Sequence, residues 1–581
     1  MCLLSKKLGK SIEGGHGRTA EMREEHQDFV KPRAIDRAVV AAQLGRDLIG
    51  SIARIPRRCS YGQPQVVSTY PVIWHNGGLG RVVKPKPFPT VYWLTCPHVR
   101  EAISVLESEG MIGEAAELIE RDEDFRKAHE CANTRYAAQR MALIGEDDLE
   151  FLEKEAPKML RVLRNTGIGG VARFAGVKCL HMHVADYMAG NNNPVGDMAV
   201  STLRQAGVWL ECDGGRCVPA RVAAINAGSN STKVLVADVV SRLNWSVGSD
   251  GSVCSKIMKA YGDSGVVGVP RVFGVCMDAR ITGLGHGLGE TGRLSEAGRA
   301  ATVEAISDFM GLSRSLGADR VWVTATAAAR AAEDSEALIR QVKEACEVRL
   351  EVVSPEFEAE LSFLGVVAGA GSAAAVGSVA PSVAIDPRSL LIVDSGGMST
   401  EFTRLDSCTG EVRSISLPLG AVSLTDEFLC SDPPSRGEIE QMRGHIRFCL
   451  EEAREFVHGL PMDGEDGGIL STIVVVGGSA VTLASIGLEL ETLDPDMVHG
   501  YALHREELEE AFLGLCSLAC AERMQVKGMI QPERARVMPA GAAIILEVMD
   551  LAGAAEVVVS AAGILDGMAA CIGLGRCGSK L

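Results

Sequence analysis

The 581-residue sequence contains no long, strongly apolar run. Its longest uncharged stretch includes residues 363–385, which are mainly Gly, Ala and Ser and contain Pro381. Because a membrane-spanning helix needs about 20 predominantly apolar residues, this stretch predicts a packed helix followed by a loop. The N-terminus also lacks a long apolar core followed by a small-residue cleavage site. We therefore expect a cytoplasmic protein that crosses no membrane.

The cysteines show no sign of a disulfide framework. Seventeen of them, an odd number, are scattered over the whole chain, whereas disulfide-rich domains are short and secreted. We expect reduced thiols, which agrees with a cytoplasmic location.

Beyond residue 100 the chain lacks the positive charge that nonspecific nucleic-acid binding requires. Residues 1–100 hold 16 Lys and Arg against 7 Asp and Glu, so with a total charge of −17 the remaining 481 residues carry −26. We expect no nucleic-acid partner, and an anionic ligand of the C-terminal part needs local cations and backbone amides. The basic N-terminal segment either touches an anionic partner or is solvated surface.

The chain is too long for a single hydrophobic core and predicts several compact units. Residues 1–34 are polar and predict a flexible tail. Residues 35–212 contain apolar residues at helical spacing and predict an α-rich α+β unit. After about residue 213, β-branched runs alternate with Ala- and Glu-rich helical segments, which is typical of an α/β architecture.

Two segments 168 residues apart carry the same pattern. AINAGSNSTKVLVADV (224–239) aligns with IVDSGGMSTEFTRLD (392–406). Each copy follows an apolar strand and continues as a second strand, so the pattern predicts a duplicated β-hairpin. A third glycine turn, in VVVGGSAVTLAS (474–485), leaves a β-branched strand and enters a helical segment.

Paired glycine turns of this kind can hold phosphate groups. Glycine allows close backbone approach with positive φ, and successive N–H groups bind an anion. Ser and Thr hydroxyls add donors, and an acid at the strand end can orient Mg²⁺ or its waters. One such turn alone is more often only a turn, but the pair predicts a phosphate cleft.

The hairpins and the third turn resemble the phosphate loops of the acetate kinase, Hsp70 and actin superfamily. Within it, further segments resemble the exopolyphosphatase and guanosine pentaphosphate phosphatase (Ppx/GppA) family: GETGRLSEAG, VTATAAARAA, SPEFEAELSFLG, SLPLGAVSLTDEFL, MVHGYAL, ERARVMPAGAAIILE and VSAAGILDG. They occur in the family's order over about residues 220–570. The resemblance implies an α/β, actin-like fold with two RNase H-like lobes, residues 219–346 and 347–565, with residues 566–581 returning to the first. It places the active site between the lobes.

The same resemblance implies roles for individual residues. Glu358 matches the glutamate that positions or deprotonates the attacking water, Asp394 and Glu401 match acids that serve Mg²⁺ and catalysis, and Arg330 matches an arginine that neutralises phosphate charge. Asn226 occupies the metal position of the first turn. The implied phosphate-binding residues are Gly228, Ser229, Asn230 and Ser231 in the first turn, Gly396, Gly397, Ser399 and Thr400 in the second, and Gly477, Gly478 and Ser479 in the third. Without the resemblance, Glu358 would be a solvated helix residue and Arg330 a surface ion pair.

The predicted function is release of terminal phosphate from inorganic polyphosphate or guanosine pentaphosphate, with Mg²⁺ as cofactor. A homodimer is also expected. The alternative is a degenerate module that binds polyphosphate or guanosine polyphosphate without hydrolysing it. An actin-like kinase is a weaker third reading, because the nearest motifs are those of hydrolases.

Several positions depart from the family pattern, which indicates altered metal dependence, a different anionic substrate, or a cleft that binds without hydrolysing. Asn226 replaces an Asp, Met398 replaces a Gly, and Arg536 stands where an Asp is expected. Pro355 and Phe357 replace a Gly and an acid beside Glu358, and SAAGILDG lacks the expected acids. Met398 in particular would place a side chain where backbone should meet phosphate.

Residues 35–200 resemble a bacterial domain of unknown function, number 501, through RRCSYGQPQVV, PFPTVYWLTCP, VKCLHMHVADYMAG and NNPVG. That resemblance implies no activity. Cys179, His181 and His183 form a C-x-H-x-H cluster whose donors suit Zn²⁺. On a strand all three would face one side and could share a metal, whereas on a helix they would splay around the axis. The alternative is buried structural Cys and His.

Overall fold

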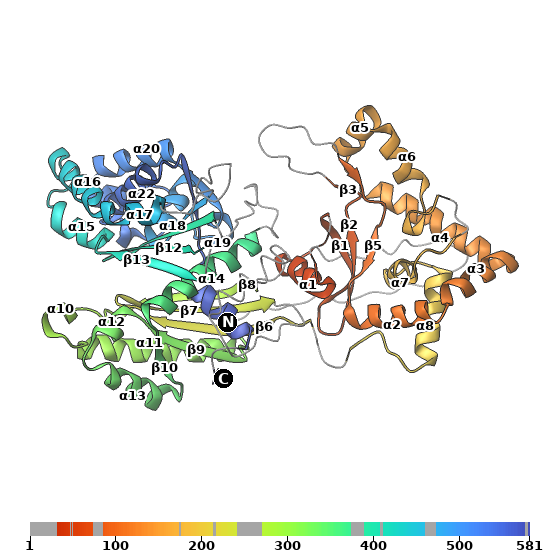
Figure 1. The fold of residues 1–581 in the computed structure, drawn as a ribbon, viewed down its shortest axis with the longest axis horizontal. Helices are drawn as coiled ribbons and strands as arrows, with labels where there is room; N and C mark the ends of the chain where they lie inside the picture. The colour runs from red at the N-terminus through yellow and green to blue at the C-terminus, as the bar shows by residue number, and fades with distance from the viewer. Residues whose placement is uncertain are drawn as a thin grey trace, which may run out of the picture.

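The computed structural model describes residues 32–46, 48, 50–73, 85–172, 176–212, 217–240, 270–373, 389–406, 411–458, 472–575 and 579–581. The predicted flexible tail lies almost entirely outside these ranges. Figure 1 shows an N-terminal unit at one end of the molecule and two sheets with their helices at the other.

The N-terminal unit packs helices against a small antiparallel sheet of order β1-β2-β5. Its strands are β1 (Ile52–Arg58), β2 (Pro64–Thr69) and β5 (Tyr92–Leu94), with β3 (Val72–Ile73) paired to β4 (Lys86–Pro87). Its helices are α1 (Ala34–Leu44), α2 (Pro97–Ser108), α3 (Met111–Arg121), α4 (Glu123–Ala142), α5 (Glu146–Glu155), α6 (Pro157–Asn165), η1 (Ile168–Gly170), α7 (Leu180–Met188) and α8 (Pro194–Gln205). The predicted α-rich α+β unit is confirmed.

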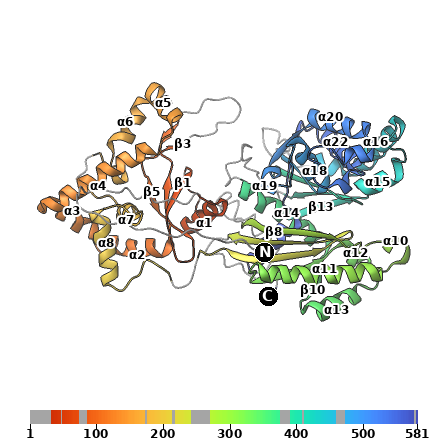
Figure 2. The ribbon, with the colours of Figure 1, turned by 180° about the vertical axis from the view of Figure 1, so that it is seen from behind.

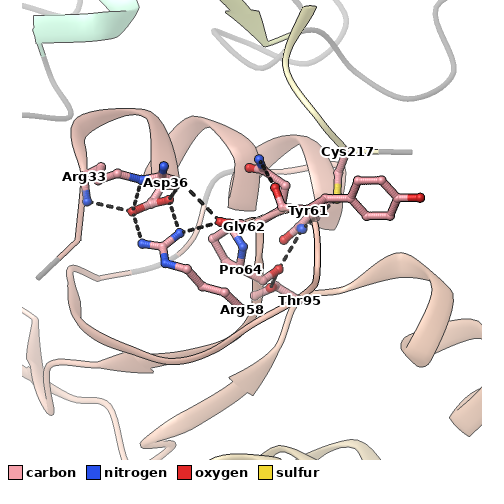
Figure 3. A network of polar contacts seen from close by, with 10 residues as sticks. Arg33, Asp36, Arg58, Tyr61, Gly62, Pro64, Thr95 and Cys217 are labelled. Carbon is pink, nitrogen blue, oxygen red and sulfur yellow. Dashed lines mark hydrogen bonds and ion pairs between the residues drawn. The ribbon is translucent and has the colours of Figure 1, made fainter. Parts of the chain in front are cut away.

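Helix α1 is fixed to the first hairpin by a buried acid. Figure 3 shows Arg33 and Arg58 converging on Asp36, with Arg58 Nη2 2.6 Å from Asp36 Oδ2. Burial raises the pKa of Asp36, but hydrogen bonds from these two arginines hold this pKa below its ordinary value. A buried carboxylate is tolerated only when it is paired in this way, so α1 is held in one position on the sheet.

The same helix contacts the next part of the chain. Ala38 and Val39 pack against Val240 and Phe273, and Gln43 donates to the Pro64 carbonyl at 2.8 Å while its amide lies 3.2 Å from Cys217 Sγ. In Figure 1 and Figure 2, α1 lies on the side of the N-terminal unit that faces the lobes. The N-terminal unit is thus joined to the rest by packing as well as by the chain.

Two six-stranded sheets follow, and the same strand order recurs in both. The first has the order β10-β9-β6-β7-β8, with β17 paired to β9, and the second has the order β13-β12-β11-β14-β16-β15. The first sheet consists of β6 (Ala220–Ala227), β7 (Ser231–Val240), β8 (Arg271–Ile281), β9 (Arg320–Ala325), β10 (Leu350–Val352) and β17 (Ser579–Lys580). The second consists of β11 (Leu390–Ser395), β12 (Thr400–Leu405), β13 (Val412–Leu417), β14 (Thr472–Val476), β15 (Tyr501–His504) and β16 (Glu556–Val559).

The pairing directions also repeat. In each sheet, neighbours among the first three strands are antiparallel, and the next two strands run parallel to the third. In this order, β8-β7-β6-β9-β10 of the first sheet corresponds to β13-β12-β11-β14-β16 of the second. This duplication confirms the predicted α/β, actin-like fold with two lobes. Because β10 pairs with β9, the first sheet extends beyond the predicted lobe end at residue 346, and β17 at the end of the chain lies in it.

Helices cover the outer face of each sheet and fill the space between the sheets. The outer helices of the first lobe are α10 (Leu288–Thr291), α11 (Glu296–Ser315), α12 (Ala327–Ala331) and α13 (Ser335–Cys346). Those of the second are α15 (Ala421–Phe428), α16 (Arg436–Leu450), η4 (Glu451–Ala453), α17 (Arg454–His458), α18 (Gly478–Gly487), α19 (Pro495–Val498), α20 (Arg505–Ser517), α21 (Cys520–Arg523), η5 (Pro532–Arg534) and α22 (Met538–Ala552). Between the sheets lie α14 (Pro355–Ala373) and α23 (Ile564–Gly573), which share one core with the inner faces of both.

Glycines allow α14 and α23 to cross in direct contact. A Cβ at Gly365 would lie 1.8 Å from the Gly563 carbonyl oxygen, and a Cβ at Gly567 would lie 1.8 Å from the Leu361 carbonyl oxygen. The helix predicted from residue 363 is therefore the second half of α14, and the predicted loop after it lies mostly outside the described ranges. No helix in the described ranges is long and apolar enough to cross a membrane. The 13 cysteines in these ranges are all free thiols.

We predict that Gly365→Ala destabilises the two-lobed part of the protein. The added methyl group has no space at the helix crossing, and overpacking of this kind costs about 1–3 kcal/mol. Gly311→Ala in α11 is the matched control, because a Cβ there meets nothing within 4 Å and should stabilise by about 0.4–1 kcal/mol. The measurement is the melting temperature of each variant by calorimetry. Equal melting temperatures for the two variants would contradict the close crossing of α14 and α23.

Candidate active site between the lobes

The two predicted hairpin turns have the same geometry. Ala227 pairs with Thr232 in the first turn and Ser395 with Thr400 in the second, positions exactly matched by the sequence repeat. In each turn the amide of the first glycine donates to the serine carbonyl three residues later, at 3.0 Å in the first and 2.9 Å in the second. The predicted duplicated hairpin is confirmed.

Both turns end strands whose inner faces look toward the other lobe. Val222 and Ala224 of β6, and Leu390 and Ile392 of β11, belong to the core that encloses α14 and α23. Alternate residues of a strand share one face, so Asn226 continues the first inner face and Asp394 in β11 continues the second. The two residues therefore lie at corresponding ends of facing surfaces.

Each turn presents two consecutive amides to an incoming ligand. Ser229 and Asn230 in the first turn, and Gly397 and Met398 in the second, donate to no acceptor within the described residues. Successive free N–H groups bind anions. Because these four amides occupy equivalent places in the two turns, the geometry agrees with a phosphate site on each lobe.

The reason for glycine in the turns differs from the predicted one. Gly228, Gly396 and Gly397 do not have φ in the left-handed region. Instead, a Cβ at Gly228 or Gly396 would come within 3.2 or 3.0 Å of the serine carbonyl oxygen of its turn, so a larger residue would crowd the turn. Met398 is 65% exposed and also lacks positive φ. Its replacement of a glycine is thus compatible with an undistorted turn.

Two of the predicted phosphate-binding hydroxyls are directed elsewhere. Thr400 is fully buried and its hydroxyl donates to the Leu419 carbonyl at 2.5 Å. Ser479 is also buried, and its Oγ lies against α22, where a Cβ at Gly541 would approach it to 2.3 Å. Both hydroxyls lie inside the fold, and the expectation that these two residues bind phosphate stays a prediction.

The third turn brings the start of α18 against the second hairpin. Gly477 has φ 101°, and a Cβ there would lie 2.6 Å from the Ser395 carbonyl oxygen and 3.1 Å from Asp394 Oδ1. A Cβ at Gly478 would lie 1.9 Å from Arg534 Nη1. Only glycine fits here, and the turn places an arginine beside the helix N-terminus, where anions are favoured.

Two carboxylates stand directly opposite each other on the second hairpin. Asp394 pairs in register with Glu401, and the hydroxyls of Ser399 and Ser416 hold Glu401 Oε1 at 2.5 and 2.8 Å. Burial, and then the charge of Glu401, raise the pKa of Asp394 to about 6. Like charges directly across a strand pair are unfavourable, so this pair costs stability and indicates a cation-binding function.

Glu358 and Arg330 form an ion pair with each other, a contact that was not predicted from the sequence. Glu358 lies in the first turn of α14, and its Oε2 is 2.6 Å from Arg330 Nη1, which also donates to the Val353 carbonyl at 3.0 Å. Burial raises the pKa of Glu358, and the hydrogen bond from Arg330 acts in the opposite direction. A half-buried carboxylate with a raised pKa is suited to accept a proton.

Two cations that were not singled out from the sequence also belong to this site. Lys233 pairs in register with Asn226 in the first hairpin, just as Glu401 pairs with Asp394 in the second. Its charge lowers the pKa of Asp394, so the two groups interact across the lobes. Burial lowers the pKa of Lys233, although the residue keeps much of its surface exposed. The second cation is Arg534. The sequence signal that could have identified Lys233 is the 168-residue offset, and the signal for Arg534 is the ERARV segment.

The remaining departures from the family pattern make contacts of their own. The Asn226 amide oxygen accepts from the Thr324 hydroxyl at 3.0 Å, and the side chain is buried. Phe357 packs on Trp322 with ring centroids 5.9 Å apart, and Arg536 pairs with Asp426. Phe357 and Arg536 thus form structural contacts.

The acids of this site fit Mg²⁺ shared with a substrate. Glu358, Asp394 and Glu401 offer hard oxygen ligands, yet within the described residues they do not form a group of three donors all within 4.8 Å of one another. Mg²⁺ usually takes one or two carboxylates together with substrate phosphates and waters. The arrangement therefore suits a metal that binds together with a phosphate chain.

The predicted cluster of Cys179, His181 and His183 does not form. Its segment is helix α7, because Leu180, Val184, Ala185 and Met188 are buried at helical spacing. His183 points into the core, where its Nδ1 lies 3.2 Å from the Asn193 amide oxygen and its ring stacks on His129. The strand on which shared ligation depended is absent from this segment.

The repeated sheets and facing turns define a two-lobed, actin-like protein. Residues 273–571 match the family model of the Ppx/GppA phosphatase family, and residues 55–201 match one described as a protein of unknown function, DUF501. The chain therefore belongs to the Ppx/GppA phosphatase family, fused to a DUF501 unit. Both resemblances are confirmed, as is the predicted enzyme class, a hydrolase acting on phosphoanhydrides.

Individual relatives agree with this membership. Exopolyphosphatase 2 of Mycobacterium tuberculosis (strain ATCC 25618 / H37Rv) is 30% identical over 361 residues, covering 60% of this chain and 97% of the relative. Exopolyphosphatase 1 of the same strain is 30% identical over 162 residues, covering 28% of this chain and 43% of the relative. Among solved structures, the Aquifex aeolicus Ppx/GppA phosphatase is 26% identical with a TM-score of 0.45, covering 60% of this chain and 98% of that chain.

We predict that Asp394→Asn raises the melting temperature of the metal-free protein. An acid whose folded pKa is raised binds protons more tightly when folded, so its ionisation costs stability as pH rises from 3.8 to about 6. The gain over wild type should be full above pH 6 and should shrink as pH falls toward 3.8. Glu510→Gln, at an exposed acid of the same lobe, should change the melting temperature little. If Asp394→Asn were less stable than wild type at pH 7 in EDTA, the inferred cost of ionising Asp394 would be contradicted.

Proposed function

We propose that this chain releases terminal phosphate from inorganic polyphosphate in a reaction that requires Mg²⁺. The observation that carries the proposal is the pair of facing turns, each with two free amides, flanked by acids on one lobe and by Lys233 on the other. Relatives named exopolyphosphatase support the substrate class. A linear chain of phosphoryl groups suits two equivalent anion sites in succession.

Binding would divide between amides and cations. The amides of Ser229 and Asn230 would hold one phosphoryl group, and those of Gly397 and Met398 another. Lys233, together with Arg534 beside the α18 N-terminus, would neutralise the non-bridging oxygens. Such contacts matter most where water is excluded, because fixed dipoles and charges act strongly in a low dielectric.

Hydrolysis would require a water aligned with the terminal phosphorus. Glu358 would accept a proton from this water as its oxygen bonds to phosphorus, and the bridging P–O bond would break to leave the shortened chain. Arg330 would hold the carboxylate of Glu358 in place. Asp394 and Glu401 would hold Mg²⁺, which supplies charge neutralisation at the phosphoryl oxygens.

Other expectations remain proposals of the same kind. Guanosine pentaphosphate is a second substrate to assay, because the family name includes its phosphatase. The cytoplasmic location is supported by the free thiols in the described ranges. The homodimer stays a prediction for sedimentation analysis.

We expect Glu358→Gln to lower kcat for phosphate release about 10²–10⁴-fold, the usual contribution of a general base, while polyphosphate binding is retained. Glu356→Gln is the matched control, because Glu356 lies in the same helical turn but is exposed. The measurement is phosphate release from polyphosphate and, separately, from guanosine pentaphosphate with Mg²⁺. If Glu358→Gln released phosphate as fast as wild type, the role of Glu358 as the proton acceptor would be overturned.

We expect Asn226→Asp to lower the Mg²⁺ concentration needed for half-maximal activity, because it adds a carboxylate opposite Lys233 at the inner edge of β6. Thr324→Val is the companion variant, since it removes only the hydroxyl that donates to Asn226. A wild type that binds polyphosphate without turnover, together with an active Asn226→Asp variant, would establish the degenerate binding module instead.

A further inference from the structure

Three metal-binding side chains converge in the N-terminal unit, away from the phosphatase site. Glu107 lies near the end of α2, Cys179 directly precedes α7, and His181 lies in the first turn of α7. One donor atom from each lies within 4.8 Å of the other two. The family match assigns no function to this unit, and the proposed hydrolysis does not use these residues.

Local structure explains why the three meet. Cys179 has extended backbone angles, φ −161° and ψ 127°, and caps α7, so its side chain can fold back over the first helical turn toward His181. The Leu180 amide donates to Glu107 Oε1 at 2.6 Å, which ties α2 to the start of α7. Negative ligands are favoured at a helix N-terminus, and both thiolate and carboxylate are negative.

The hydrogen bonds of His181 leave one ring nitrogen for a ligand. Its Nε2 lies 3.1 Å from the Arg100 carbonyl oxygen, which can only accept, so Nε2 carries the proton. The Nδ1 of a neutral ring then presents a lone pair to Glu107 Oε1 at 3.2 Å and to Cys179 Sγ at 3.5 Å. A lone pair that faces a carboxylate oxygen is unfavourable unless a proton or a metal ion lies between the two atoms, so this position can hold either. A backbone carbonyl on the second ring nitrogen is also the usual support of a metal-binding histidine.

The spacing of the donors fits tetrahedral zinc. With the usual Zn²⁺ bond lengths to sulfur, nitrogen and oxygen, a tetrahedral angle places S and N about 3.6 Å apart and N and O about 3.3 Å apart. The separations here are 3.5 and 3.2 Å. A thiolate, an imidazole and a carboxylate favour Zn²⁺ over Mg²⁺ or Ca²⁺, and the two negative ligands balance its charge.

The geometry argues against a cysteine nucleophile. In a Cys–His–acid relay the thiol and the acid contact opposite nitrogens of the imidazole. Here Cys179 and Glu107 both approach Nδ1. Both Glu107 and His181 keep about a quarter of their side-chain surface exposed, so water and a metal ion can reach the cluster.

We propose that Glu107, Cys179 and His181 bind one Zn²⁺ per chain, with water or an exogenous ligand in the fourth position. The ion would clamp the end of α2 to the start of α7. His183, the third member of the sequence cluster, takes no part.

The test is Zn²⁺ titration of the full-length, EDTA-stripped protein in excess Mg²⁺, followed by metal analysis and by the thiolate absorption of the Co²⁺-loaded protein. Wild type should bind one Zn²⁺ per chain, and Cys179→Ser and Glu107→Gln should each weaken binding at least about tenfold. Cys131→Ser alters an exposed cysteine on α4 and should bind as wild type does. Asp394→Asn should also retain Zn²⁺, which separates this site from the acids between the lobes.

The proposal is overturned if wild type binds no Zn²⁺, if the Co²⁺ protein lacks thiolate absorption, or if Glu107→Gln binds as tightly as wild type. Circular dichroism checks folding of each variant. Should Cys179→Ser fail to fold, the nearly isosteric Glu107→Gln variant decides the outcome alone. Phosphate release is not the readout, so failure of the proposed hydrolysis leaves this test unaffected.

Discussion

The C-terminal part of the molecule depends on two similar hairpins that face each other and carry different charges. On one lobe Asp394 and Glu401 oppose each other in register and repel. On the other lobe the equivalent pair is Asn226 and Lys233, which carries one positive charge. The positive charge of Lys233 across the lobes offsets part of this repulsion, and a bound cation would offset the rest.

The distance between these hairpins is set by helices that leave no space at their crossing. Helices α14 and α23 share one core with both inner sheet faces, and glycines at the crossing bring their backbones together. Glu358 begins the first of these helices, so the same packing that spaces the lobes also positions the proposed base. A change in lobe spacing would therefore move Glu358 relative to the turns.

The two turns share one backbone geometry but differ in their opposed side chains. Each turn keeps two amides that donate to no acceptor among the described residues, whereas the opposed pair is Asn226 and Lys233 in the first hairpin and Asp394 and Glu401 in the second. Phe357 and Arg536 make packing and ion-pair contacts of their own, so their altered chemistry is compatible with an intact pair of turns. The site therefore has two acids on one lobe and a cation on the other.

Local sequence patterns predicted an α/β architecture and the repeated hairpins, because strand periodicity and turn glycines are local properties of the chain. The two-lobed fold and the roles of Glu358 and Arg330 followed from ordered motifs that resemble the family, and the contact between these two residues is shown only by the structure. The sequence could not decide which hydroxyls lie inside the fold: Thr400 and Ser479 are taken up by contacts with Leu419 and α22. Only the tertiary structure brought Lys233 and Arg534 to the site and replaced His183 by Glu107 in the N-terminal cluster. Those associations depend on how helices and sheets pack across long sequence separations, which no local pattern encodes.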